Sequence, residues 1–164
     1  MQRLTTEIPN MTAPLIFVDS GVLLATLDAR DANLQAAARA WVARCWRQRT
    51  GRISTQVLNE FYNGALKTFG ITEKTTVTPA HVRMHVRRLR EWQPPHLDRY
   101  AVDGAWDVQD RYELSYWDAL IISSAQQQGC AYVLSLELPA GKTIDGLQII
   151  HPLHTQPVNI EGAL

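Results

Sequence analysis

Cysteine is scarce in this chain of 164 residues. Cys45 and Cys130 are the only two, they stand in apolar surroundings, and neither has a second cysteine at metal-ligand spacing. The sequence therefore gives no sign of a disulfide framework or a cysteine zinc site, and we expect two buried thiols in a reducing compartment. One domain of this length buries roughly two thirds of the surface of its unfolded chain and needs no cross-link.

An excess of charge of one sign is also missing. Sixteen basic residues balance sixteen acidic ones, so net charge predicts no bulk attraction to nucleic acid or to a membrane, and any anion-binding surface must come from local clustering. No apolar run approaches the roughly 20 residues of a membrane span. The N-terminal stretch MQRLTTEIPNMTAP lacks the apolar core of a signal peptide. We expect a cytoplasmic protein without membrane contact and with a flexible N-terminal arm at 1–14.

The stretch LIFVDSGVLL, residues 15–24, organises the rest of the chain. Four apolar residues in a row predict a strand that is covered on both faces, as in a parallel sheet. Asp19 follows this strand, and a helix begins after it. Asp19 thus lies at the carboxyl edge, where open α/β sheets bind their ligands. The alternative is that Asp19 only caps the helix.

Strands and helices alternate along the chain, which predicts an α/β fold. We expect a three-layer α/β/α sandwich with a mainly parallel sheet of four or five short strands in a domain at 15–153, followed by a C-terminal tail at 154–164. Apolar spacing and caps predict helices at 22–27, 31–49, 55–69, 79–92, 101–112 and 116–128. Strands are expected at 15–18, 52–54, 96–99, 131–135 and 148–150.

Four carboxylates fall at one edge of this predicted sheet: Asp19, Glu60, Asp118 and Glu137. Two unit charges about 4 Å apart repel by about 4 kcal/mol at an effective dielectric constant near 20, so converging acids need a cation. Oxygen ligands favour Mg²⁺ or Mn²⁺, and a water on such an ion can supply the hydroxide that attacks a phosphodiester. The chain has no glycine-rich phosphate loop and no serine or cysteine nucleophile elbow.

Each acid also has a purely structural interpretation. Asp118 fits a capping box with Ser115, Glu60 fits a solvated helix residue paired with Lys67, and Glu137 fits an ordinary loop acid. The joint pattern is more specific than any one member, because all four acids fall at equivalent ends of successive elements.

Four segments carry a resemblance to a known family: IFVDSGVLL, ISTQVLNEFYN, LSYWDALIISSA and AYVLSLELPAGKTIDGLQIIHPL. They resemble the successive motifs of the PIN-domain ribonucleases, particularly the VapC-like toxins of bacterial toxin-antitoxin pairs, over nearly the whole span 15–153. The resemblance implies a Mg²⁺- or Mn²⁺-dependent ribonuclease that acts on single-stranded RNA, frequently as a homodimer, and often an antitoxin partner. It assigns the first three acidic positions to Asp19, Glu60 and Asp118, with Ser20 as the small hydroxyl residue after the first acid.

The fourth motif departs from the family pattern. Relatives of this type usually read Ser-Glu-Asp-Leu, whereas this chain reads Ser135-Leu136-Glu137-Leu138. A glutamate has one more methylene and more rotamers to freeze than an aspartate, so Glu137 would coordinate through a shifted shell. The alternative function is therefore a catalytically weakened PIN-like module that binds RNA or protein.

A basic stripe is predicted on the helix at 79–92. Arg83, Arg87 and Arg90 share one side of this helix. They are candidates for neutralising RNA phosphates, which cationic side chains contact whatever the base sequence. The alternatives are a solvated helix face and contacts to an antitoxin.

An aspartyl-phosphate phosphatase is disfavoured, because its second aspartate would stand where this chain has Gly21.

Overall fold

The computed structural model describes residues 13–70 and 77–160. Most of the arm expected at 1–14 and the end of the expected C-terminal tail therefore lie outside the described residues. In chain order the elements are β1 (Ile16–Val18), α1 (Ser20–Ala25), α2 (Ala32–Gln48), β2 (Gly51–Arg52), α3 (Thr55–Phe69), α4 (Pro79–Leu89), the 3₁₀ turn η1 (Arg90–Trp92), α5 (Arg99–Tyr112), α6 (Tyr116–Gln127), β3 (Tyr132–Leu134), β4 (Thr143–Ile144), β5 (Leu147–Ile150) and the 3₁₀ turn η2 (Pro157–Ile160).

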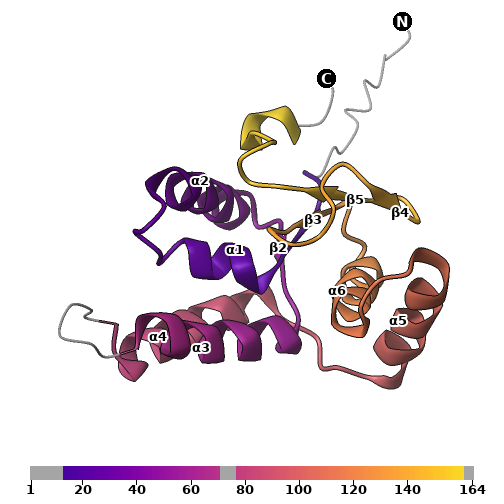
Figure 1. Ribbon diagram of the computed structural model, residues 1–164, viewed down its shortest axis with the longest axis horizontal. Coiled ribbons are helices and arrows are strands. Elements are labelled where there is room, and N and C mark those ends of the chain that lie inside the picture. Colours follow the sequence, from indigo (N-terminus) through magenta and orange to yellow (C-terminus); the bar gives the residue numbers. More distant parts are fainter. Residues whose placement is uncertain (1–12, 71–76, 161–164) are drawn as a thin grey trace, which may run out of the picture.

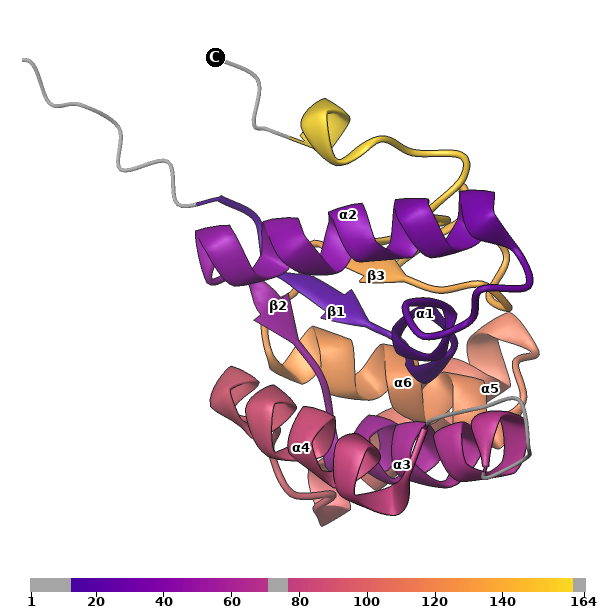
Figure 2. The same ribbon diagram turned by 90° about the vertical axis from the view of Figure 1, so that its left-hand side faces the viewer.

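A five-stranded sheet in the order β2-β1-β3-β5-β4 forms the centre of the described chain. β1 pairs in parallel with β2 and β3, β3 pairs in parallel with β5, and β4 runs antiparallel to β5. Figure 2 shows α2 on one face of the strands and α6 on the other. α5 packs beside α6, and α3 and α4 lie beneath α1 (Figure 1). The predicted α/β sandwich with a mainly parallel sheet is confirmed.

Burial explains why these segments adopt their structure. Ile16, Phe17 and Val18 are fully buried, as expected for a strand covered on both faces. All six α-helices of the described residues begin after a Ser, Thr or Asp whose side chain accepts a backbone N–H. These caps are Asp19, Asp31, Ser54, Thr78, Asp98 and Ser115.

One predicted strand is absent from the structure, and one observed strand was not predicted. The segment at 96–99 is not a strand, because Asp98 accepts the N–H of Ala101 and starts α5 at Arg99. The strand β4 was not predicted from the sequence. A two-residue turn with positive φ at Asp145 (49°) and Gly146 (84°) folds β4 back on β5.

The expectation of two buried thiols agrees with the structure. Cys45 and Cys130 are free and buried, and burial raises the pKa of each thiol to about 12. The described part of the C-terminal tail packs on α2, since the indole N–H of Trp41 donates to the carbonyl of Thr155 at 3.1 Å. Within residues 13–70 and 77–160, none of the helices has both the length and the apolar character to cross a membrane.

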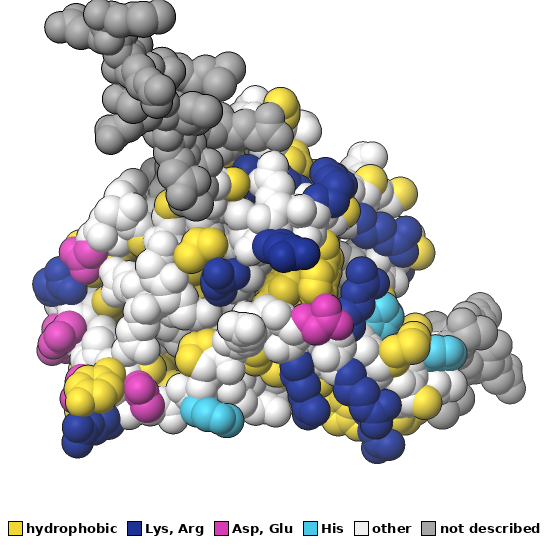
Figure 3. Space-filling view, turned by 180° about the vertical axis from the view of Figure 1, so that it is seen from behind, with side chains coloured by type: hydrophobic (Ala, Val, Ile, Leu, Met, Phe, Trp, Pro, Cys, Tyr) yellow, Lys and Arg dark blue, Asp and Glu magenta, His cyan; other side chains and the backbone are white. Residues whose placement is uncertain are grey.

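The predicted basic stripe lies on the surface of α4 and at the start of the turn η1 that follows it. Arg83, Arg87 and Arg90 are exposed, and the Nε of Arg83 donates to the hydroxyl of Tyr62 on α3 at 3.4 Å. Figure 3 shows the molecule from behind. On this face, Lys and Arg side chains gather on the half where α2 and α4 lie. The neutral chain therefore carries a local positive surface.

We predict that Gly51→Ala lowers the free energy of unfolding by about 1–3 kcal/mol, because it overpacks a closed site. A Cβ at Gly51 would lie 2.6 Å from the ring of Trp92, which is itself buried and packed against Trp46. Urea unfolding measures the loss. Gly21→Ala is the control, because its Cβ would meet nothing closer than 3.6 Å and alanine favours the helix. Equal stability of Gly51→Ala and wild type would contradict this packing.

Candidate functional site

Asp19 sits where β1 ends, and two neighbours fix its carboxylate. Its backbone N–H donates to the carbonyl of Leu134 on β3 at 3.0 Å. One carboxylate oxygen accepts the N–H of Ser20 and the other accepts the hydroxyl of Ser135, each at 2.7 Å. Asp19 therefore caps α1 and also meets the residue that follows β3. The capping and ligand interpretations are compatible in this geometry.

Ser135 is fully buried, and its hydroxyl has a fixed orientation. Its oxygen accepts the N–H groups of Glu137 and Leu138, each at 3.2 Å. Both backbone donors approach the oxygen, so its single proton is committed to Asp19. Ser135 thus holds the turn after β3 and aims Asp19 at the same time.

Glu60 reaches the same edge from α3. One carboxylate oxygen accepts the hydroxyl of Ser20 at 2.8 Å, and the other accepts the amide nitrogen of Gln56 at 2.8 Å. The Ser20 oxygen also lies 3.5 Å from an oxygen of Asp19. Ser20 therefore stands between the two carboxylates and brings together residues 41 positions apart in the chain.

Like charge is concentrated at this edge. Burial raises the pKa of Asp19 above its usual value, and the nearby charges of Glu60 and Glu137 raise it further, while the hydrogen bonds from Ser135 and Ser20 lower it. Glu137 is exposed, yet it lies close enough to affect Asp19.

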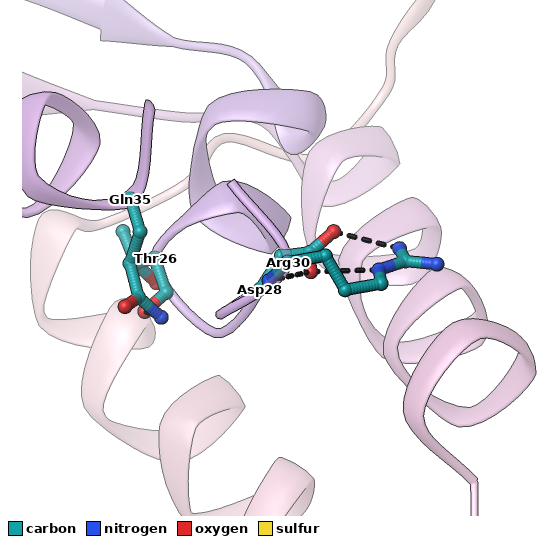
Figure 4. Close-up of polar contacts among 4 residues, drawn as sticks. All are labelled: Thr26, Asp28, Arg30 and Gln35. Carbon is teal, nitrogen blue, oxygen red and sulfur yellow. Dashed lines mark hydrogen bonds and ion pairs between the residues drawn. The ribbon is translucent and has the colours of Figure 1, made fainter. Parts of the chain in front are cut away.

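Among the described residues, no Lys or Arg forms an ion pair with any of the four predicted acids. Asp28 gives the contrast. The guanidinium of Arg30 faces its carboxylate (Figure 4) and lowers the pKa of Asp28 to about 2.

Asp118 belongs to a neighbouring hydrogen-bond set. Its carboxylate accepts the hydroxyl of Ser115 at 2.7 Å, and its N–H donates to the same hydroxyl oxygen at 3.2 Å. The amide nitrogen of Gln56 links this turn to Glu60, because it also lies 3.5 Å from the carbonyl oxygen of Trp117. The structure thus joins Asp19 to Glu60, places Glu137 within electrostatic reach of Asp19, and holds Asp118 in the adjoining turn.

The donor set at this edge suits a hard divalent cation. Within the described part of the chain, no three His, Cys, Asp or Glu side chains are grouped closely enough to hold a metal ion together. The pair Asp19 and Glu60 nevertheless fits Mg²⁺, which is bound through one or two carboxylates and keeps several waters. Among residues 13–70 and 77–160 no Lys or Arg pairs with these two carboxylates, so a divalent ion bound there would relieve their repulsion.

Two residues that orient the carboxylates of the site were not predicted from the sequence. Gln56 stands four residues before Glu60 on the same helix face, and that spacing is a usable signal. Ser135 belongs to the fourth motif, which assigns it no role of its own. Its contact with Asp19 follows from the pairing of Val18 with Leu134 across the sheet, which sequence spacing does not reveal.

The sequence profile of the PIN domain family matches residues 16–137. This stretch covers most of the chain and contains Asp19, Glu60, Asp118 and Glu137. This chain belongs to the PIN domain family. No curated protein matches it in sequence.

Two solved structures share the PIN fold with this chain. One is the Mycobacterium tuberculosis toxin VapC20, described as a sarcin-ricin loop cleaving toxin, with 20% identity and a TM-score of 0.52 over 72% of this chain and 86% of that one. The other is a toxin-antitoxin complex from Klebsiella pneumoniae, with 17% identity and a TM-score of 0.57 over 84% of this chain and 97% of that one. At these identities the likeness concerns the fold.

We predict that Asp19→Asn leaves the metal-free protein as stable as wild type or raises its melting temperature by up to about 4 °C at neutral pH. Asparagine retains the cap at Ser20 and loses the bond from the Ser135 hydroxyl, a cost that is offset because the substitution removes a charge that is unfavourable in the folded state. Because folding raises this pKa, the penalty on the charged form applies above the folded pKa and disappears as pH falls toward 3.8.

Thermal melts in EDTA at several pH values, with Asp28→Asn as a control, measure this difference. A large drop in melting temperature for Asp19→Asn at neutral pH would show that the carboxylate charge is structural.

Proposed function

We propose that this PIN-domain protein is a metal-dependent endoribonuclease that hydrolyses single-stranded RNA and serves as the toxin of a toxin-antitoxin pair. The observation that carries the proposal is the serine-bridged pair Asp19 and Glu60 at the carboxyl edge of the sheet, with which no Lys or Arg in the described part of the chain forms an ion pair. Family membership supports nuclease chemistry at that edge.

The chain's own residues have distinct roles in this proposal. Asp19 and Glu60 would hold Mg²⁺ or Mn²⁺, and Asp118 and Glu137 would add negative charge beside the ion. Ser20, Ser135 and Gln56 orient the first two carboxylates through hydrogen bonds. A bound divalent ion would acidify water and stabilise the charge that develops on the phosphate.

The exposed arginines of α4 and η1 are proposed to bind RNA phosphates. α4 packs on α3, the helix that carries Glu60, and Arg83 already contacts Tyr62 two residues beyond it. Phosphate contacts position a strand without reading its sequence. Arg83, Arg87 and Arg90 would therefore guide RNA toward the acids.

A catalytically weakened binding module is the second candidate, and the fourth motif favours it. The side chain of Leu136 packs partly against the core and faces Gly21, so this position contributes no carboxylate. Glu137 is exposed. Mn²⁺-dependent cleavage of RNA separates the two candidates.

We predict that Asp19→Asn and Asp118→Asn each lower kcat/KM for RNA by at least about 100-fold. Mutation of a residue that only supports a metal ligand already lowers activity by up to about that factor. The assay is cleavage of a mixed single-stranded RNA pool with and without Mn²⁺. Asp145→Asn is the matched control, because Asp145 pairs with Arg111. Cleavage by either variant at the wild-type rate would remove that acid from the site.

An antitoxin is the proposed protein partner, and a groove between α1, α2, α3 and α4 fits it. The groove has a volume of about 430 Å³ and an apolar floor that includes Leu23, Val42 and Phe61. Arg39, Arg47 and Arg88 line it too, and Arg88 stacks over Trp46 at 4.9 Å. An amphipathic segment with acidic residues complements this floor and rim. The homodimer stays a prediction.

We predict that Ala43→Glu releases RNA cleavage from inhibition by the product of the adjacent reading frame. Ala43 is exposed and lines the groove, so a carboxylate there repels an acidic segment. Ala40→Glu is the matched control, because Ala40 is exposed on the same helix outside the groove. Binding and cleavage assays on both variants measure the effect. Equal inhibition of both variants would place the partner elsewhere.

A further inference from the structure

Trp117 is a large apolar side chain at the surface, immediately before Asp118. Its exposed fraction is 62%, among the highest of the exposed large hydrophobic side chains. The ring of Tyr116 meets it edge to face, with centroids 5.4 Å apart and an interplanar angle of 61°. Tyr116 itself packs against the core. The indole is therefore supported by Tyr116 on one side and is open to solvent, and it is not part of the hydrophobic core.

Trp117 forms one wall of a surface hollow of about 490 Å³. The other walls are Thr55, Gln56, Asn59, Glu60 and Leu97. Glu60 thus belongs both to the acidic pair and to this hollow. The nitrogen of Gln56 donates to Glu60 and approaches the carbonyl of Trp117, so the indole is tied to the acidic pair through one side chain.

The polar groups of the hollow suit a planar heterocycle. Asn59 is exposed and offers an amide with two donors and an acceptor. The side-chain oxygen of Gln56 is buried and has no hydrogen-bond partner among the described residues, so Asn59 supplies the amide that is open to a ligand. An aromatic plane beside amide groups is the combination that proteins use to stack and read an unpaired nucleobase.

A second hollow continues the surface toward the basic helix. It shares Thr55 and Asn59 with the first and extends to Tyr62, Arg90 and His96. A strand that places one base on Trp117 therefore has a path along α3 to a cation that can meet its phosphates.

We propose that the hollow between Trp117 and α3 is a subsite for one unpaired nucleobase of the RNA substrate, next to the phosphate that is cleaved. The base stacks on the indole, and the amide of Asn59 meets its edge. This inference rests on the proposed nuclease function and adds a residue that selects single-stranded substrate.

The first test compares Trp117→Ala with Trp117→Phe and with Trp106→Ala. Trp106 is 54% exposed on α5 and serves as the matched control. Loss of one stacked base lowers kcat/KM for a short RNA by roughly 5-fold to 100-fold. We expect this loss, mainly through KM, in Trp117→Ala, partial rescue in Trp117→Phe and no change in Trp106→Ala.

The second test removes bases from the substrate. A set of RNA oligonucleotides carries one abasic nucleotide at each position around the cleaved bond. Wild type should lose activity strongly at one position, and Trp117→Ala should lose nothing more at that position, because the two changes remove the same contact. Additive losses at every position would overturn the proposal.

A third measurement separates this inference from the proposed nuclease function. Binding of the same oligonucleotide to Asp19→Asn and to the double variant Asp19→Asn with Trp117→Ala, followed by fluorescence anisotropy, needs no catalysis. Weaker binding by the double variant supports the subsite even if wild type cleaves no RNA. Equal binding by the two variants would overturn the proposal. The proposal would also be overturned if Trp117→Ala dissociated a dimer in sedimentation while no single abasic position lowered the activity of wild type.

Discussion

The site depends on two serine hydroxyls that hold carboxylates against their own repulsion. Ser135 donates to Asp19, and Ser20 donates to Glu60 while its backbone N–H donates to Asp19. Hydrogen bonds to the ionised form offset part of the burial that raises the pKa of Asp19. The remaining repulsion would favour a cation at this edge, since a divalent ion relieves like charge that no Lys or Arg of the described residues pairs with.

The sheet brings these hydroxyls and acids together because its strands are parallel and short. β1 and β3 end side by side, so Asp19 and Ser135 leave the sheet at the same edge. α1 starts at that point and positions Ser20 toward α3. Glu60 needs the helix cap at Ser54 and the contact of α1 with α3 to reach the same place. The departure at Leu136 fills space against Gly21, whereas the backbone of Glu137 stays bound to Ser135.

Much of the fold was predictable because its signals are local. A run of four apolar residues predicted buried β1, and Ser and Thr caps predicted where α3, α4 and α6 begin. The strand expected at 96–99 was wrong because the cap at Asp98 outweighs a short pattern there. The acids could be placed at one edge from the order of elements. The hydrogen bonds of Ser135 could not, because they depend on the register between strands far apart in the chain.

Calorimetric titration of Mn²⁺ into the purified protein at neutral pH tests the central claim most directly, because it measures whether the serine-held carboxylates bind a divalent ion. The account predicts a binding event in wild type that Asp19→Asn abolishes and Asp28→Asn retains, since Arg30 already neutralises Asp28. Binding of Mn²⁺ with equal affinity by wild type and Asp19→Asn, or no binding by wild type even in the presence of an RNA oligonucleotide, would contradict it.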